Sequence, residues 1–191
     1  RVDALILAPL DAQALVPPVQ AATQQKIPVV IIDSDLRSSV HQAFIATDNR
    51  LGGRISAKRL CEQLGGRGKV ALLRYAKGSA STTAREAGFL DGLRAYGPKM
   101  ELVSDKMYAG VTVEQATTAA TRLLTKHPDL NGVSTPTETS TQGMLQALRT
   151  RGKAGRVKFV GFDSNPLLLN ALQKGEIHGL AVQDPFAMGY E

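Results

Sequence analysis

Short apolar runs that end abruptly in a carboxylate constrain the fold of this chain most strongly. The clearest run extends from Val157 to Phe162 with little alternation, and Asp163 follows it directly. Continuous apolar runs of this length are typical of parallel strands that are covered on both faces. Asn165 and Pro166 then supply an N-cap and a first-turn proline, which predicts that a helix begins at once.

The same arrangement recurs along the chain, because the apolar run 28–32 also ends in a carboxylate, Asp33. Further strand patterns lie at 4–8, 43–46, 69–75, 101–108, 132–135 and 178–183. Segments with the apolar spacing of a helix separate most of these predicted strands. The first helical segment begins at Asp11, and the prolines at 17 and 18 require the helix to restart or kink there. Alternating strands and helices predict an α/β protein with parallel sheets flanked by helices.

Polar residues collect where the predicted strands end. They are Asp33, Asp48, Asn49, residues 79–83, Thr137, Glu138, Asp163 and Gln183. In open α/β sheets ligands bind outside the carboxyl ends of the strands, so these residues are candidates for a binding site. A second interpretation stays open for Asp163, which in that position could simply cap the helix or the turn.

Composition and length fit a globular protein with one large or two small domains, since 43% of the residues are hydrophobic and 21% are charged. No apolar run approaches the roughly 20 residues that span a bilayer. The chain opens on Arg1 without a methionine or a signal pattern, so we expect an internal fragment with any signal peptide upstream. Cys61 is the single cysteine and lies in a helical pattern with Leu51 and Ile55, which favours a buried structural thiol.

The chain carries a formal net charge of +6, with a basic excess between Arg37 and Lys99. These charges fall mostly on the polar sides of predicted helices and in loops. Aromatic residues do not interleave with them as a nucleic-acid stacking surface requires. The pattern therefore favours a solvated basic face and predicts no nucleic-acid partner.

Several catalytic and cofactor patterns are incomplete. The glycines at 65–68 lie between a helix and the next strand, which is the wrong side of the sheet for a phosphate loop, and Gly68-Lys69 lacks the following Ser or Thr. The run 78–81 does not complete a nucleophile elbow. The histidines are scattered away from cysteine pairs, so we expect no metal and no cofactor. The remaining carboxylates, amides and hydroxyls suit a neutral polyol and predict binding, not catalysis.

A series of sequence segments, in order, resembles a known family. The segments are RVDALILAPLDAQAL, IPVVIID, ATDNRLGGR, AREAGFLDGL, VGFDSNP and AVQDPFAMG. The chain resembles the type I periplasmic sugar-binding proteins over essentially its whole length, the ribose-binding group most closely. This resemblance implies two lobes, each a parallel sheet flanked by helices, joined by three crossover strands. It also implies that a small sugar, a pentose such as ribose or a similar one, is enclosed between the lobes and delivered to an ABC transporter.

The resemblance also implies where the lobes begin and end. Residues 1–47 and 184–191 would form part of the first lobe, and residues 48–183 the second, with further N-terminal and C-terminal parts outside this chain. The implied protein is a monomer in the periplasm, or an extracellular lipoprotein, whose partners are the sugar and the transporter permease.

Three residues match the binding positions of the family directly. Asp33 and Asp163 match the two hydroxyl-binding aspartates, and Gln183 matches the glutamine at the final crossover. The resemblance therefore implies that these side chains hold the sugar.

Four further candidates depart from the family or have an open role. Ser34 stands where an arginine is usual, Thr83 replaces the sugar-binding arginine before a second-lobe helix, and Thr137 replaces an asparagine. Arg85 falls on the second arginine of the family, which is more often structural, and a ligand contact is the alternative. These departures leave the identity of the sugar open.

Two other functions are alternatives to sugar transport. The effector domain of a LacI-type, sugar-responsive transcription repressor shares this fold, and the basic excess leans toward it. The loop 77–83 and the segment around Gln183 are closer to the transport group. A Rossmann-like enzyme acting on sugar is disfavoured by the missing phosphate loop.

Overall fold

The computed structural model describes residues 2–191 and contains eight strands and seven helices within that range. The strands are β1 (Leu5–Leu7), β2 (Val29–Ile32), β3 (Ala43–Ile45), β4 (Arg67–Leu72), β5 (Lys99–Ser104), β6 (Gly132–Ser134), β7 (Lys158–Phe162) and β8 (Gly179–Ala181). The helices are α1 (Val16–Gln24), α2 (Asn49–Gln63), α3 (Ala80–Tyr96), α4 (Val113–Lys126), α5 (Glu138–Thr150), α6 (Pro166–Gln173) and α7 (Pro185–Tyr190). The predicted alternation of strands and helices is confirmed.

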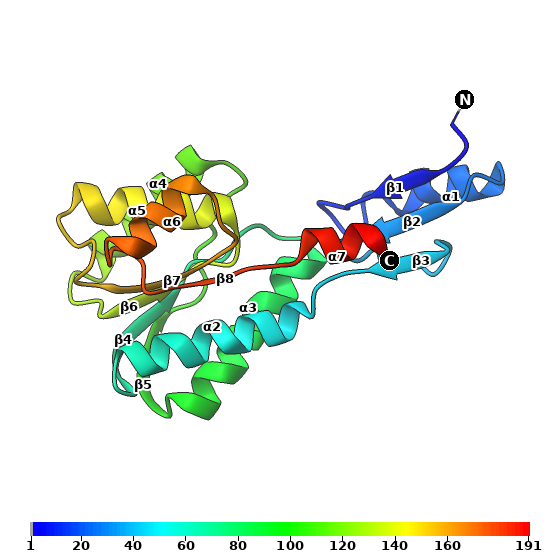
Figure 1. The fold of residues 1–191 in the computed structure, drawn as a ribbon. Coiled ribbons are helices and arrows are strands. Elements are labelled where there is room, and N and C mark those ends of the chain that lie inside the picture. Colours follow the sequence, from blue (N-terminus) through cyan, green and yellow to red (C-terminus); the bar gives the residue numbers. More distant parts are fainter. Residues whose placement is uncertain (1) are drawn as a thin grey trace.

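The strands form two separate parallel sheets, which give the molecule two lobes (Figure 1). The first lobe contains the sheet β1-β2-β3 and α1, and the second lobe contains the sheet β5-β4-β6-β7-β8 and helices α2 to α6. Every pairing between neighbouring strands in these sheets is parallel. The two-lobed α/β architecture agrees with the sequence prediction.

The sheet of the second lobe is covered on both faces, which explains its continuous apolar strands. Side chains of Val70 and Leu72 pack with α2 and α3, whereas those of Ala71 and Leu73 pack with α4 and α5. Successive residues of a strand point to opposite faces, so a sheet between two helix layers needs apolar residues at every position. Cys61 is buried on the α2 side, as predicted.

Helices α2 and α3 approach closely through two glycines. A Cβ added at Gly53 would overlap the carbonyl oxygen of Arg85, and one added at Gly88 would overlap the carbonyl oxygen of Arg50. The missing side chains therefore let the two backbones touch. This contact fixes the part of α3 that carries Arg85.

Some sequence predictions of the elements were wrong in detail. Helix α1 begins at Val16, with its two prolines in the first turn, because proline is tolerated there, whereas Asp11 only accepts from the N–H groups of a preceding turn. Leu51 and Ile55 lie in the same helix as Cys61 but are exposed. Strands β4 and β5 begin and end earlier than predicted, and beyond them only Arg74 and Tyr108 pair, as a single bridge.

Two segments cross between the lobes side by side (Figure 1). One leads from β3 into α2 and the other from β8 into α7. Thr47 Oγ1 in the first segment donates to Gln183 Oε1 in the second at 3.0 Å, and the Met188 sulfur lies 4.0 Å from the same hydroxyl. No helix among residues 2–191 has the length and apolar character needed to cross a membrane.

Candidate functional site

Each lobe presents an aspartate at the carboxyl end of a strand, in the same backbone conformation. Asp33 follows β2 with φ +62°, and Asp163 follows β7 with φ +64°. The N–H of Asp33 donates to Ile45 O at 3.0 Å, and that of Asp163 donates to Ala181 O at 2.7 Å. These acceptors are the last residues of the adjacent strands β3 and β8. Aspartate tolerates this left-handed region better than most residues, so the chain turns here without glycine.

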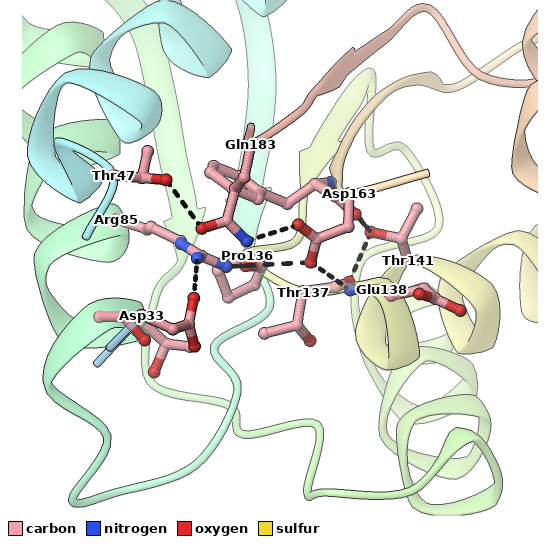
Figure 2. A network of polar contacts seen from close by, with 12 residues as sticks. Asp33, Thr47, Arg85, Pro136, Thr137, Glu138, Thr141, Asp163 and Gln183 are labelled. Carbon is pink, nitrogen blue, oxygen red and sulfur yellow. Dashed lines mark hydrogen bonds and ion pairs between the residues drawn. The ribbon is translucent and has the colours of Figure 1, made fainter. Parts of the chain in front are cut away.

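Arg85 lies between the two aspartates (Figure 2). Its guanidinium nitrogens are 3.8 Å from Asp33 Oδ1 and 3.9 Å from Asp163 Oδ2, and its side chain is only 4% exposed. Nε donates to Asn49 Oδ1 at 2.7 Å, and Nη1 donates to Pro136 O at 3.0 Å. The carboxylates of both lobes therefore converge on one cation that the second lobe holds firmly.

The environment of this cation shifts the titration of the groups around it. The guanidinium lies 4.0 Å from the centre of the Phe162 ring, and burial lowers its pKa while Asp163 and Asp33 oppose that change. Burial raises the pKa of the Asp33 carboxyl, the positive charge of Arg85 counteracts the rise, and Asp163 adds to it. Two carboxylates and one guanidinium thus provide strong hydrogen-bond acceptors and donors in a partly buried site.

Besides Arg85, two other parts of the chain hold the Asp163 carboxylate. Gln183 Nε2 donates to its Oδ1 at 2.9 Å, and the backbone N–H of Glu138, the first residue of α5, donates to its Oδ2 at 3.2 Å (Figure 2). Asn165, not Asp163, caps α6 by accepting from the N–H of Leu168. The interpretation of Asp163 as the cap of its own following helix is therefore wrong. Through Gln183 and Thr47, this carboxylate is connected to both crossing segments.

A cavity of about 230 Å³ lies at this point, and most of the predicted site residues line it. They are Asp33, Ser34, Arg85, Thr137, Asp163 and Gln183. An adjoining cavity of about 470 Å³ shares both aspartates and Gln183 and extends along Glu138, Val182 and Met188. No group of three His, Cys, Asp or Glu side chains suited to a metal ion occurs among residues 2–191.

Three of the hydroxyl candidates differ in how the structure uses them. Ser34 is buried and its Oγ accepts from the N–H of Ser81 in the second lobe at 3.2 Å. Thr137 is the N-cap of α5 as well as part of the cavity wall. Thr83 is exposed, its hydroxyl donates to Ser79 O at 2.7 Å, and it does not line the cavity.

The cavity wall also includes Tyr75, Ser79, Ser81 and Thr82, none of which was matched to a binding position of the family. Ser79, Ser81 and Thr82 were among the polar residues expected at the ligand-binding edge of the sheet, whereas Tyr75 was missed. The hydroxyl-rich loop before α3 was a signal for three of them, but the resemblance selected Thr83. Consecutive helical residues point about 100° apart, so an error of one position moves a side chain from the cavity to solvent. Tyr75 gave no signal, because it continues the apolar pattern of a strand.

Comparison with known proteins identifies the family. A sequence model described as "Periplasmic binding protein domain" matches residues 1–191. The D-ribose/D-allose-binding protein of Pseudomonas aeruginosa is 33% identical over 97% of this chain and 59% of its own length, and the ribose import binding protein of Bacillus subtilis is 29% identical over 98% and 60%. The chain therefore spans about 60% of the length of these curated relatives.

Solved structures agree with this assignment over nearly the whole chain. The periplasmic component of an ABC-type sugar transport system from Hahella chejuensis is 41% identical with a TM-score of 0.94, covering 100% of this chain and 69% of that one. A carbohydrate transporter solute-binding protein from Agrobacterium radiobacter, in complex with D-arabinose, is 34% identical with a TM-score of 0.91, covering 98% and 65%. The fold, the site and these likenesses agree, and the chain belongs to the periplasmic binding protein family, in its type I sugar-binding group.

Proposed function

We propose that the cleft between Asp33 and Asp163 binds a small neutral sugar, a pentose such as ribose or a similar monosaccharide. The single observation that carries this proposal is the convergence of two carboxylates from different lobes on the buried Arg85, at the wall of a cavity. A carboxylate accepts hydrogen bonds from adjacent hydroxyls, and hydroxyl and amide side chains both donate and accept. A relative named for D-ribose and D-allose, and a solute-binding protein whose structure is a complex with D-arabinose, support the same class of ligand.

We also propose that the protein delivers this sugar to the permease of an ABC transporter and catalyses no reaction. It would act as a monomer in the periplasm, or outside the cell as a lipoprotein. The names of the relatives support transport, because they describe import and ABC-type sugar transport and not repression. The effector domain of a repressor is therefore not proposed.

In this proposal the lobes move as two bodies about the crossing segments. The first body comprises residues 1–47 with 184–191, and the second comprises residues 48–183. The hydrogen bond between Thr47 and Gln183 places the two crossings together, as a hinge requires. Gln183 also contacts Asp163, so the binding carboxylate and the hinge are adjacent.

Calorimetric titration of the complete natural chain tests the proposal. D-ribose, D-allose and D-arabinose are the probes, and L-leucine is the control compound. We expect saturable binding of at least one sugar and none of leucine. Asp33→Asn should weaken that binding, whereas Asp35→Asn should not, because Asp35 lies two residues further on and outside the cavity wall. An absence of saturable heat with every sugar would reject the proposed function.

A further inference from the structure

One hydroxyl in the cavity wall, that of Thr82, is buried and has no hydrogen-bond partner among residues 2–191. The N-cap and the first turn of α3 carry four hydroxyl side chains, Ser79, Ser81, Thr82 and Thr83, and three of these hydroxyls have polar contacts within the chain. Ser79 Oγ accepts from the N–H of Thr82 at 3.4 Å and lies 3.4 Å from Ser81 Oγ, and Thr83 Oγ1 donates to Ser79 O. Thr82 Oγ1 is buried without a partner among residues 2–191, and the residue is only 3% exposed.

The local backbone explains why Thr82 lacks the partner that its neighbour has. A helical threonine commonly donates to the carbonyl four residues earlier, as Thr83 does with Ser79. For Thr82 that carbonyl belongs to Gly78, which precedes the N-cap and lies outside the helix. The Gly78 carbonyl instead accepts from the N–H of Ala12 in the first lobe at 3.0 Å.

A buried hydroxyl without a partner is unfavourable, and native proteins rarely keep one without a reason. Thr82 lines the same cavity of about 230 Å³ as Asp33 and Asp163. A ligand in that cavity lies next to Thr82, and a hydroxyl can both donate and accept a hydrogen bond. The hydroxyl that lacks a partner therefore belongs to a residue of the proposed binding site.

We propose that Thr82 Oγ1 hydrogen-bonds a hydroxyl of the bound sugar and helps to select which sugar is bound. This inference rests on the proposed function and adds a determinant of specificity to it. The two aspartates accept from sugar hydroxyls at the centre of the cleft. Thr82 contacts the sugar from the wall formed by the second lobe and favours sugars that carry a hydroxyl at that position.

Three variants of the complete natural chain test this role by calorimetry, with whichever of D-ribose, D-allose and D-arabinose binds most tightly. Thr82→Val keeps the shape but removes the hydroxyl, and the sugar hydroxyl left without a partner should weaken binding about 5- to 100-fold. Thr82→Ser keeps the hydroxyl and should bind within about 3-fold of the natural protein. Thr83→Val is the matched control, because its hydroxyl lies outside the cavity, and it should bind like the natural protein.

Urea denaturation without sugar separates this role from a structural one. Thr82→Val removes a buried hydroxyl that has no partner among the described residues, so its unfolding midpoint should stay the same or rise. Thr83→Val should lower the midpoint, because it breaks the bond to Ser79 O. A clear fall for Thr82→Val would mean that its hydroxyl is satisfied within the protein, and would overturn the inference.

Sugars that lack one hydroxyl provide the decisive comparison. One deoxy sugar lacks the hydroxyl that contacts Thr82. The natural protein should bind this deoxy sugar more weakly than the parent sugar, whereas Thr82→Val should bind the two equally well, because the variant has already lost the Thr82 hydroxyl. If the natural protein binds a sugar and Thr82→Val binds it with equal affinity, the inference fails and the proposed function stands. If the natural protein binds none of the sugars, the proposed function fails and the inference falls with it.

Discussion

Asp33 and Asp163 occupy the same unusual conformation in two different lobes. Both have φ near +60°, and both use their N–H to bond the end of the neighbouring strand. A left-handed residue other than glycine is uncommon and is enriched at functional sites. The conformation turns each side chain off the end of its strand, which is where ligands bind in parallel sheets.

Replacing Asp163 by Asn tests the binding role at constant shape. Asn also tolerates the left-handed conformation, so the turn should persist. A sugar hydroxyl that donates to the carboxylate would then face an amide, and we expect affinity to fall about 10- to 150-fold, or ~1.5–3 kcal/mol. Calorimetry of the complete natural chain measures this loss. Sugar affinity equal to that of the natural protein would remove Asp163 from the site.

The raised pKa of Asp33 should be visible in how the free energy of unfolding changes with pH. Because its folded pKa is raised above the ordinary 3.8 by burial, the folded state binds this proton more tightly than the unfolded state. That contribution to stability is full below the unfolded pKa and is lost as pH rises through the folded pKa. Asp33→Asn should therefore gain stability relative to the natural protein as pH rises from about 3.5 to 7, measured by urea denaturation. A gain that shrinks over this range would contradict the assignment.

Asp11 provides a control, because its pKa is shifted in the opposite direction and its effect on stability should therefore change with pH in the opposite direction. The N–H groups of Ala14 and Gln13 lower the pKa of its carboxyl. Its contribution is present above the unfolded pKa and is lost as pH falls through the folded pKa. Asp11→Asn should therefore be less stable than the natural protein at neutral pH, and the difference should diminish on acidification.

At the scale of elements, the glycine contact between α2 and α3 holds Arg85 in place. Gly53→Ala would force a methyl group into the backbone of α3 at Arg85. Alanine normally favours a helix over glycine by about 1 kcal/mol, but a backbone overlap of this kind should reverse the sign and cost ~1–3 kcal/mol. Both the unfolding midpoint and sugar affinity should fall.

The control for this prediction is Gly189→Ala in α7, where an added Cβ meets open space. Urea denaturation should find it as stable as the natural protein or slightly more so. If Gly53→Ala were also stabilising, the close approach of the two helices would not matter for the site.

The sequence predicted most elements and the type of fold, because the covered strands are continuously apolar and each aspartate follows such a run. It placed the start of α1 too early, since the signal at Asp11 belongs to a turn and the prolines mark the true first turn of the helix. The match to the family pointed to Thr83, whereas the cavity wall contains its neighbour Thr82. Consecutive helical residues point about 100° apart, so a match of positions along the sequence does not fix which of two neighbours faces the cavity.

At the scale of the whole molecule, the site depends on contacts that no local pattern predicts. Arg85 comes from α3, whereas its carboxylate partners follow β2 and β7, and only the folded arrangement brings them together. The lobes also touch through the Ala12–Gly78 and Ser34–Ser81 hydrogen bonds. These contacts join residues of different lobes, so opening the cleft would break them.

Small-angle scattering of the complete natural chain, with and without a sugar that calorimetry has found to bind, tests the central claim that the two lobes enclose the ligand. The hydrogen bonds between Ser34 and Ser81 and between Ala12 and Gly78 join the two lobes in this structure. We expect the radius of gyration to fall when sugar saturates the protein, because the ligand links the carboxylates of both lobes. Asp163→Asn should need more sugar to reach the same compact form. An unchanged radius at saturating sugar would contradict binding by enclosure between the lobes.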